Sequence, residues 1–129
     1  MNDIVLHIAD IFFVIFHSAI TIFNVFGWIW KKTRKLNLIT LVLTGASWFI
    51  LGIFYTFGYC PLTDWHFQVL RKLNHADLPS SYIKYLIERV TSFSPGAELV
   101  DTTTLVVFFV ALVFSVYFNI RDRKRALAG

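Results

Sequence analysis

Residues 36–59 read LNLITLVLTGASWFILGIFYTFGY and contain no Asp, Glu, Lys or Arg. A helix of this length spans about 36 Å at 1.5 Å per residue, which is enough to cross a hydrocarbon core of about 30 Å. An amphipathic helix of a soluble protein would carry charged residues along one face. The run therefore predicts a membrane-spanning helix.

Two further apolar runs flank this one, from about Ile4 to Trp30 and from about Leu99 to Ile120. The chain as a whole is 57% hydrophobic and 16% charged, whereas soluble domains average about 45–50% and about 25%. A soluble chain of 129 residues could not bury so much apolar surface. We therefore predict an all-α fold, an integral membrane three-helix bundle that forms one membrane domain over residues 1–129.

The orientation follows from two clusters of basic residues. One precedes the second span and the other follows the third, and they consist of Lys31, Lys32, Arg34, Lys35, Arg121, Arg123, Lys124 and Arg125. Three crossings place both clusters on one side, and short basic segments favour the cytoplasmic side. We expect the N-terminus outside, the C-terminus in the cytoplasm, and the tail anchored to anionic headgroups. The clusters also account for the net charge of +4 without a nucleic-acid partner.

The loop of residues 60–98 then faces outward, and it contains two amphipathic patterns. Thr63 or Asp64 can cap a helix that runs to about Leu73. Pro79 can open a second helix that runs to about Phe93. Both are too polar to cross a membrane, so we expect two interfacial helices between spans two and three, lying at the membrane surface or over the outer mouth of the bundle.

Span one carries a line of polar residues at alternating steps of four and three, a spacing that keeps them on one helix face. The members of this polar intramembrane face are His7, Asp10, His17, Thr21 and Asn24, with Asp3 and Val14 on the same line. Titratable groups inside a membrane are costly, so this face should point toward protein or water. Asp10 and His17 are two turns, about 10 Å, apart and cannot touch directly. The line either holds helices together by hydrogen bonds or forms a site for protons, a metal or a polar substrate group.

The outer mouth gathers further polar residues, namely Asp64, His66 and Asp101. The catalytic candidates are Asp10, His17, Cys60 and His66. Cys60 is either a nucleophile with His66 as its base or a structural residue at a helix end. Asp64 is interpreted as a helix cap. His7, His17 and His66 are candidate ligands for haem or a divalent metal, but no recognised ligand spacing accompanies them, so we predict no cofactor.

The run Cys60-Pro61-Leu62-Thr63-Asp64-Trp65-His66, directly after Gly58-Tyr59, resembles a family of small bacterial membrane proteins catalogued as domain of unknown function 2784. The resemblance extends to Ala9-Asp10, His17, Asn24 and Gly27 in span one, to residues 78–83, and to residues 99–101. It implies a bacterial inner membrane, Asp10, His17 and Cys60 as marked positions, and no established activity. The family pattern often has a glutamate late in span two, where this chain has Phe54 and Tyr55.

Three functions remain open. The first is a non-enzymatic membrane component that binds lipid or a partner, either a membrane protein subunit or a second copy of the chain. The second is a membrane enzyme or proton-coupled protein that uses Asp10 and His17 in a site open to the outer face. The third is a haem or metal carrier. Whether the chain is an enzyme is left undecided by the residues.

Overall fold

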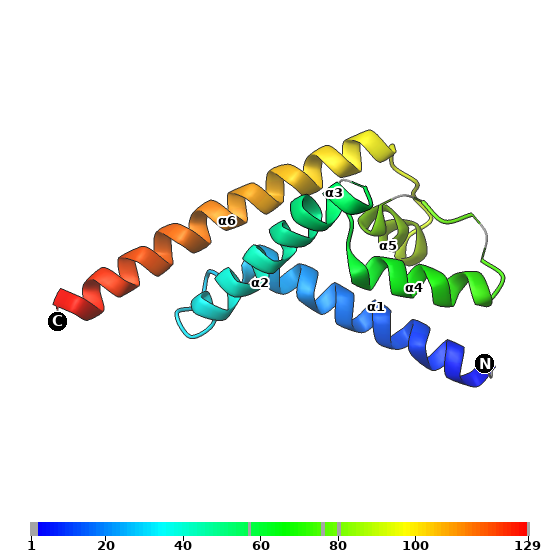
Figure 1. The fold of residues 1–129 in the computed structure, drawn as a ribbon, viewed down its shortest axis with the longest axis horizontal. Coiled ribbons are helices and arrows are strands. Elements are labelled where there is room, and N and C mark those ends of the chain that lie inside the picture. Colours follow the sequence, from blue (N-terminus) through cyan, green and yellow to red (C-terminus); the bar gives the residue numbers. More distant parts are fainter. Residues whose placement is uncertain (1–2, 57, 76, 80, 129) are drawn as a thin grey trace.

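The computed structural model describes residues 3–56, 58–75, 77–79 and 81–128, and the regular structure of these residues is helical. Three long helices dominate it (Figure 1). They are α1 (Asp3–Phe26), the continuous segment α2 (Arg34–Ala46), η1 (Ser47–Leu51, a π-helical stretch) and α3 (Gly52–Phe54), and α6 (Ala97–Ala128). Each is long and apolar enough to cross a membrane. The predicted all-α fold with three spans is confirmed.

The ends of all three spans differ from the prediction. The first helix ends at Phe26 instead of Trp30. The second helical segment ends at Phe54 instead of Tyr59, because the chain turns back at this point. The third begins at Ala97 and continues through the basic residues to Ala128. The early end of α3 matters because Gly58 and Cys60 then lie outside the helix.

The helices diverge in space. In Figure 1, α2 and α3 run beside α6, and the N-terminal half of α1 points away from both. Two shorter helices, α4 (Pro61–Lys72) and α5 (Tyr82–Val90), fill the angle between α1 and the start of α6. We call α4 and α5 together the cap. Their predicted position at the membrane interface stays a prediction.

The two cap helices begin and end at residues other than those expected. Cys60 is the N-cap of α4 and Pro61 its first helical residue, so the interpretation of Thr63 or Asp64 as the cap is wrong. Proline suits this position because its missing N–H would have no helical partner there. The second helix begins at Tyr82, where the Ser81 hydroxyl accepts a hydrogen bond from the Lys84 N–H at 3.4 Å.

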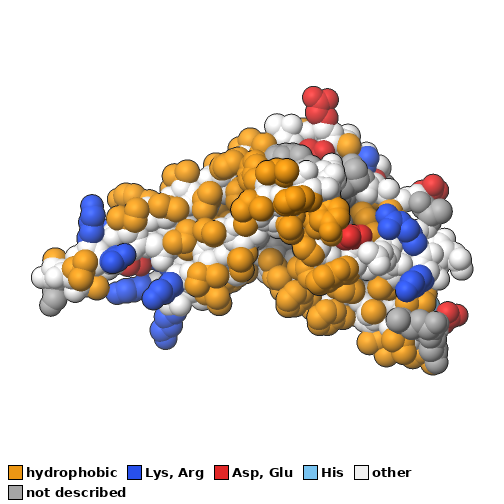
Figure 2. Space-filling view, in the orientation of Figure 1, with side chains coloured by type: hydrophobic (Ala, Val, Ile, Leu, Met, Phe, Trp, Pro, Cys, Tyr) orange, Lys and Arg blue, Asp and Glu red, His pale blue; other side chains and the backbone are white. Residues whose placement is uncertain are grey.

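The spans touch one another through a small apolar core. Its buried members are Leu41, Phe108 and Ala111, with Trp28, Trp48 and Leu112 packed against it. Most other large apolar side chains of the spans point outward; Ile15, Leu43 and Val113 are 64–65% exposed, and the visible face is largely hydrophobic (Figure 2). Such a surface is suited to contact with lipid.

The turn between α1 and α2 is stabilised by a close contact between the Gly27 backbone and the Asn37 side chain. Asn37 is fully buried, and its Nδ2 donates to the Phe23 carbonyl at 2.7 Å. A Cβ atom at Gly27 would lie 2.8 Å from Asn37 Nδ2 and 3.1 Å from Asn37 Cβ. Only glycine leaves room for this approach without a shift of Asn37.

The two basic segments lie at one end of the molecule, as three crossings require (Figure 2). Arg34 Nη1 donates to both carboxylate oxygens of Asp122, at 2.9 and 3.1 Å, and Arg34 Nε donates to the Trp28 carbonyl at 2.8 Å. Asn119 of α6 donates to the Arg34 carbonyl at 3.0 Å. We call this region the basic end.

Candidate functional site

The site is made by the turn that follows α3. Gly58 has a φ of +84°, in the left-handed region that favours glycine, and its N–H donates to the Trp48 carbonyl at 3.2 Å. The Ser47 hydroxyl donates to the Tyr59 carbonyl at 2.7 Å. These bonds fold the chain back along the π-helical stretch, and Cys60 is thereby brought against α1.

From Cys60 onward, α4 runs antiparallel to the first half of α1. Cys60 lies beside His17, with Sγ and Nε2 4.0 Å apart, and His66 lies beside Asp10. Six residues of α4 cover about 9 Å and seven residues of α1 about 10 Å, so the two spacings match. The polar face of α1 is therefore covered by a helix from the outer loop.

Asp10 is the centre of the site. Its side chain is 10% exposed, and it accepts two hydrogen bonds from Arg89, Nη1 to Oδ1 at 2.7 Å and Nη2 to Oδ2 at 3.0 Å. His66 Nε2 lies 2.7 Å from the same Oδ1. The Tyr85 hydroxyl accepts a further bond from Arg89 at 2.7 Å. A carboxylate inside the protein is thus compensated by an ion pair from α5 and a hydrogen bond from α4.

His66 connects this carboxylate to a tyrosine. Its Nδ1 lies 2.8 Å from the Tyr82 hydroxyl, and the imidazole is fully buried. An ionised carboxylate only accepts hydrogen bonds, so His66 Nε2 carries the proton and Nδ1 accepts from Tyr82. Burial lowers the pKa of His66, although the neighbouring Asp10 opposes this, and burial raises the pKa of Tyr82. A neutral imidazole beside a protonated phenol follows.

The Tyr82 ring in turn stacks on His17, with 3.9 Å between ring centroids and 12° between planes. His17 is 9% exposed. Its Nδ1 is buried with no hydrogen-bond partner among the described residues. A continuous line of contacts therefore joins Arg89, Asp10, His66, Tyr82, His17 and Cys60. We call Asp10, His66, Tyr82 and Arg89 the Asp10 network.

A family model described as "Protein of Unknown function (DUF2784)" matches residues 7–120. The chain belongs to this family. The match includes all six residues of the line just described, and it confirms the resemblance found in the sequence. Neither a search of curated proteins nor a search of solved structures gave a match.

In this DUF2784 chain, the catalytic candidates occupy two neighbouring places. Asp10 and His66 are in direct contact, and Cys60 is paired with His17 instead of His66. Both nitrogens of His66 are engaged by other groups, so this imidazole does not face the thiol. Cys60, the candidate nucleophile, therefore lies beside His17, and His66, its candidate base, lies between Asp10 and Tyr82.

The remaining residues of the predicted polar face divide at His17. Toward the basic end, the Thr21 hydroxyl donates to the His17 carbonyl at 2.8 Å, and Asn24 Nδ2 donates to Thr44 Oγ1 of α2 at 2.9 Å. The Asn24 bond joins α1 to α2, whereas the Thr21 bond stays within α1. At the other end His7 is exposed, in a shallow hollow that it shares with Ile4, Ile8 and Ile11.

The outer-mouth residues lie apart from one another. Asp64 accepts hydrogen bonds from the Tyr59 hydroxyl at 2.8 Å and from Gln68 at 3.1 Å, and the first of these raises the pKa of Tyr59 to about 12. Asp101 is exposed on α6. Neither belongs to the Asp10 network, and only His66 of the predicted outer mouth does.

The candidate metal ligands are also separate. Within the described ranges no group of three or more His, Cys, Asp or Glu side chains could hold a metal ion. His66 would have to release Asp10 or Tyr82 before it could bind a metal. His7 faces outward, and His17 has Cys60 as its neighbour.

Sequence reasoning missed Arg89, Tyr82 and Tyr85. None of the three is among the site residues predicted from the sequence. A signal was present, because a carboxylate inside a span requires a cation. Four basic residues of the loop were available for this role, namely Arg71, Lys72, Lys84 and Arg89.

Proposed function

We propose that the chain is a non-enzymatic component of a bacterial inner membrane, with its N-terminus outside, and that its cap binds a partner subunit. The observation that carries the proposal is the pairing of Asp10. Both of its carboxylate oxygens are bonded to residues of the cap, Arg89 from α5 and His66 from α4. A carboxylate used in this way fixes two loop helices to a membrane helix.

A fixed cap is suited to binding, because a preorganised surface loses little conformational entropy on association. The cap, together with Phe93 just after α5, presents exposed aromatic and aliphatic side chains. Trp65 is 53% exposed, Val90 78% and Phe93 65%. The loop of residues 60–98 contains four acidic and four basic residues, which gives no net charge. Large apolar side chains in a mixed polar setting are typical of protein–protein interfaces.

The basic end supports a role for lipid at the other side of the membrane. Lys31, Lys32 and Lys35 are exposed there, as are Arg123, Lys124 and Arg125. Each basic residue near an anionic membrane surface contributes about 1 kcal/mol of attraction. This end would then hold the protein at the cytoplasmic leaflet while the cap contacts its partner.

Photocrosslinking in native membranes tests the proposal. A photoreactive phenylalanine derivative at Trp65 or Phe93 is expected to give a discrete protein adduct, and the same residue at Ile15, which is 64% exposed on α1, is expected to give lipid adducts. Asp10→Asn should weaken the cap adduct while the protein stays in the membrane. Lipid adducts alone at Trp65 and Phe93 would contradict partner binding.

A second function is favoured by a specific observation, the series Asp10, His66 and Tyr82 with the Cys60–His17 pair at its end. A carboxylate that orients an imidazole is a frequent arrangement in enzymes. In a membrane enzyme or proton-coupled protein, Asp10→Asn and His17→Ala would both abolish a cellular phenotype without lowering abundance or melting temperature. A lowered melting temperature alone would assign these residues to packing.

A further inference from the structure

The pair of Cys60 and His17 lies outside the Asp10 network. Cys60 is the single cysteine of the chain and is half-buried at the N-cap of α4. His17 is nine-tenths buried, and its polar neighbour is the thiol, 4.0 Å from Nε2. Its Nδ1 has no hydrogen-bond partner among the described residues. A buried imidazole that the fold does not use for its own hydrogen bonds needs another explanation.

The His17 imidazole is held in place by ring stacking instead of by hydrogen bonds. Tyr82 stacks on His17, and the Tyr82 hydroxyl is bonded to His66. The Asp10 network therefore fixes the plane of His17 through Tyr82 and leaves both nitrogens free of strong bonds. This is the arrangement of a base beside a nucleophile, with a second layer of residues that positions the base.

We propose that Cys60 is a reactive thiol with His17 as its general base, and that it exchanges with disulfides at the outer face to form a mixed disulfide. The choice of a disulfide follows from the proposed orientation, which places Cys60 on the side where disulfides persist. The inference thus rests on the proposed topology, and it would give the cap a covalent way to hold a partner that carries a disulfide.

The exchange is balanced in atoms and electrons. His17 Nε2 takes the proton of the Cys60 thiol, and the thiolate attacks one sulfur of the disulfide. A new S–S bond forms as the old one breaks. The leaving thiolate then takes the proton from His17 and departs as a thiol. Since the chain contains no second cysteine to resolve the product, the mixed disulfide persists until an external thiol attacks it.

The titratable groups around Cys60 and His17 decide the pH range in which the reaction of the pair can be measured. Tyr59 precedes Cys60 and Tyr82 covers His17, and the pKa of each is raised, by the hydrogen bond to Asp64 in Tyr59 and by burial in Tyr82. Asp10 and Arg89 form an ion pair. The pKa of Asp64 is lowered by its hydrogen bonds to Gln68 and Tyr59. The pKa of His66 is lowered by burial. Between pH 7 and 9 these surrounding groups keep one protonation state.

The test is the rate at which the full-length protein, in liposomes, forms an adduct with oxidised glutathione, followed by intact mass. A peptide of residues 58–66 supplies the same Cys-Pro sequence without His17, and Cys60→Ser is the blank. At pH 7 the protein is expected to react about 100-fold faster than the peptide, which is the lower end of the range of general base catalysis. Its rate should also fall less steeply between pH 9 and 7.

His17→Gln should lower the rate to that of the peptide and restore the steeper dependence on pH. A protein that reacts no faster than the peptide would overturn the proposal, and so would a folded His17→Gln variant with the unchanged rate. If His17→Gln does not fold, the comparison of protein and peptide still decides. The assay contains no partner protein, so its failure is distinct from a failure of cap crosslinking.

Discussion

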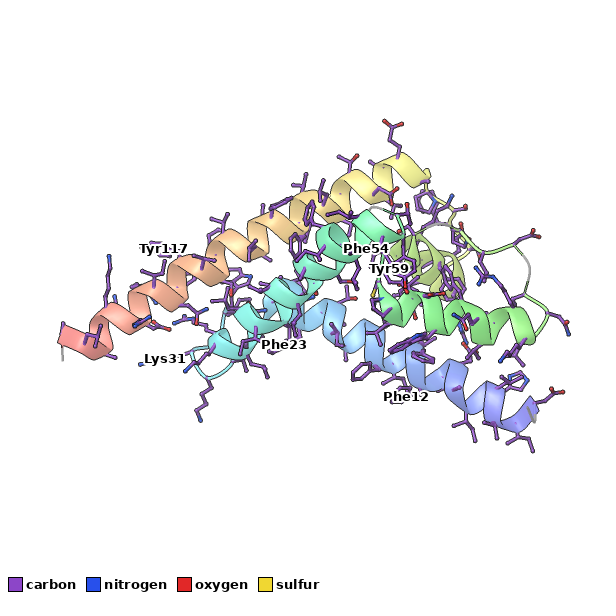
Figure 3. All side chains as sticks on the ribbon, viewed as in Figure 1. Phe12, Phe23, Lys31, Phe54, Tyr59 and Tyr117 are labelled. Carbon is purple, nitrogen blue, oxygen red and sulfur yellow. The ribbon has the colours of Figure 1, made fainter. Side chains whose placement is uncertain are left out.

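Two ion pairs, one at each end of the molecule, use the same two residue types in different ways. At the basic end Arg34 binds Asp122, and its other bonds go to the backbone of its own turn at Trp28 and Ile29. At the cap end Arg89 binds Asp10, 79 positions away in the sequence, and Asp10 is also bonded to His66. Figure 3 shows side chains throughout both regions.

The two ion pairs differ in what could compensate the carboxylate if its arginine were removed. Asp122 has a side chain that is 21% exposed and lies among basic residues, whereas that of Asp10 is 10% exposed. Water or a neighbouring cation can serve Asp122, but Asp10 would remain a charge inside the protein. The cap end therefore depends on a specific side-chain network, and the basic end depends more on the backbone approach at Gly27.

The largest effect is expected from Arg89→Leu. It leaves Asp10 without its cation, and loss of one partner of a buried pair costs about 3–5 kcal/mol, with the lower value expected because the Arg89 side chain is 32% exposed. Arg34→Leu is the matched variant and should cost clearly less, because Asp122 can be hydrated when its arginine is removed. Thermal or denaturant unfolding in detergent micelles measures both.

A double variant separates the pair from general damage. Asp10→Asn added to Arg89→Leu removes the uncompensated charge, so the double variant should be more stable than Arg89→Leu alone. Equal losses for Arg89→Leu and Arg34→Leu would abolish the distinction between the two ends.

The next effect concerns the basic end. Gly27→Ala would place a Cβ atom 2.8 Å from Asn37 Nδ2, and overpacking of this kind costs about 1–3 kcal/mol. Gly96→Ala is the control, because no atom lies within 4 Å of the Cβ position there. A melting temperature that is lowered by Gly27→Ala and unchanged by Gly96→Ala is expected. If Gly27→Ala leaves the melting temperature unchanged, the close contact of the Gly27 backbone with Asn37 does not stabilise the basic end.

The third prediction is a dependence of stability on pH at the cap end. The pKa of His66 is lowered by burial from 6.5, so the unfolded chain binds a proton before the folded one does. Its contribution to stability is complete above about pH 6.5 and is lost as the pH falls from there toward the lower folded pKa, by at most about 1.4 kcal/mol per pH unit. Unfolding measured at pH 7.5 and 5.5 should show this loss, and His66→Gln should reduce it.

The smallest effects are expected from the loss of a single tyrosine hydroxyl, first in Tyr82→Phe. This variant removes the hydroxyl that donates to His66 Nδ1 at 2.8 Å but keeps the ring that stacks on His17. Loss of one such bond costs about 1 kcal/mol. The matched variant Tyr85→Phe removes a bond to Arg89, and it should cost less because Arg89 keeps both bonds to Asp10. A larger cost for Tyr85→Phe would mean that the stability of the network depends more on the bonds of Arg89 than on those of His66.

The three spans could be predicted because a long apolar run is a local property, visible in residues 36–59 without knowledge of any partner. The burial of Asp10 and His17 was equally accessible, since the polar face of a helix follows from its spacing. The partners were not accessible in this way. His66 and Arg89 reach Asp10 only because the turn at Gly58 sends α4 back along α1, and that direction is not encoded in any short pattern.

One of the two interpretations of Cys60 gave it His66 as a base, and the distance between these residues does not favour that pairing. The two residues are close in sequence, but Cys60 stands at the N-cap of α4, and six residues of helix carry His66 about 9 Å away from it. The polar face was also predicted to include His7, which the structure leaves exposed. Spacing along one helix shows which residues share a face, but not how far the neighbouring helix extends along it.

The distance in sequence between Asp10 and Arg89 has a consequence for synthesis. A ribosome completes Asp10 79 residues before Arg89, so the first hydrophobic segment meets the translocation machinery while its carboxylate has no cation. Every intermediate shorter than 89 residues holds that acid without its final partner. The Asp10 network thus closes only after α5 has been made, and α6 still has to follow before the core of the spans can form.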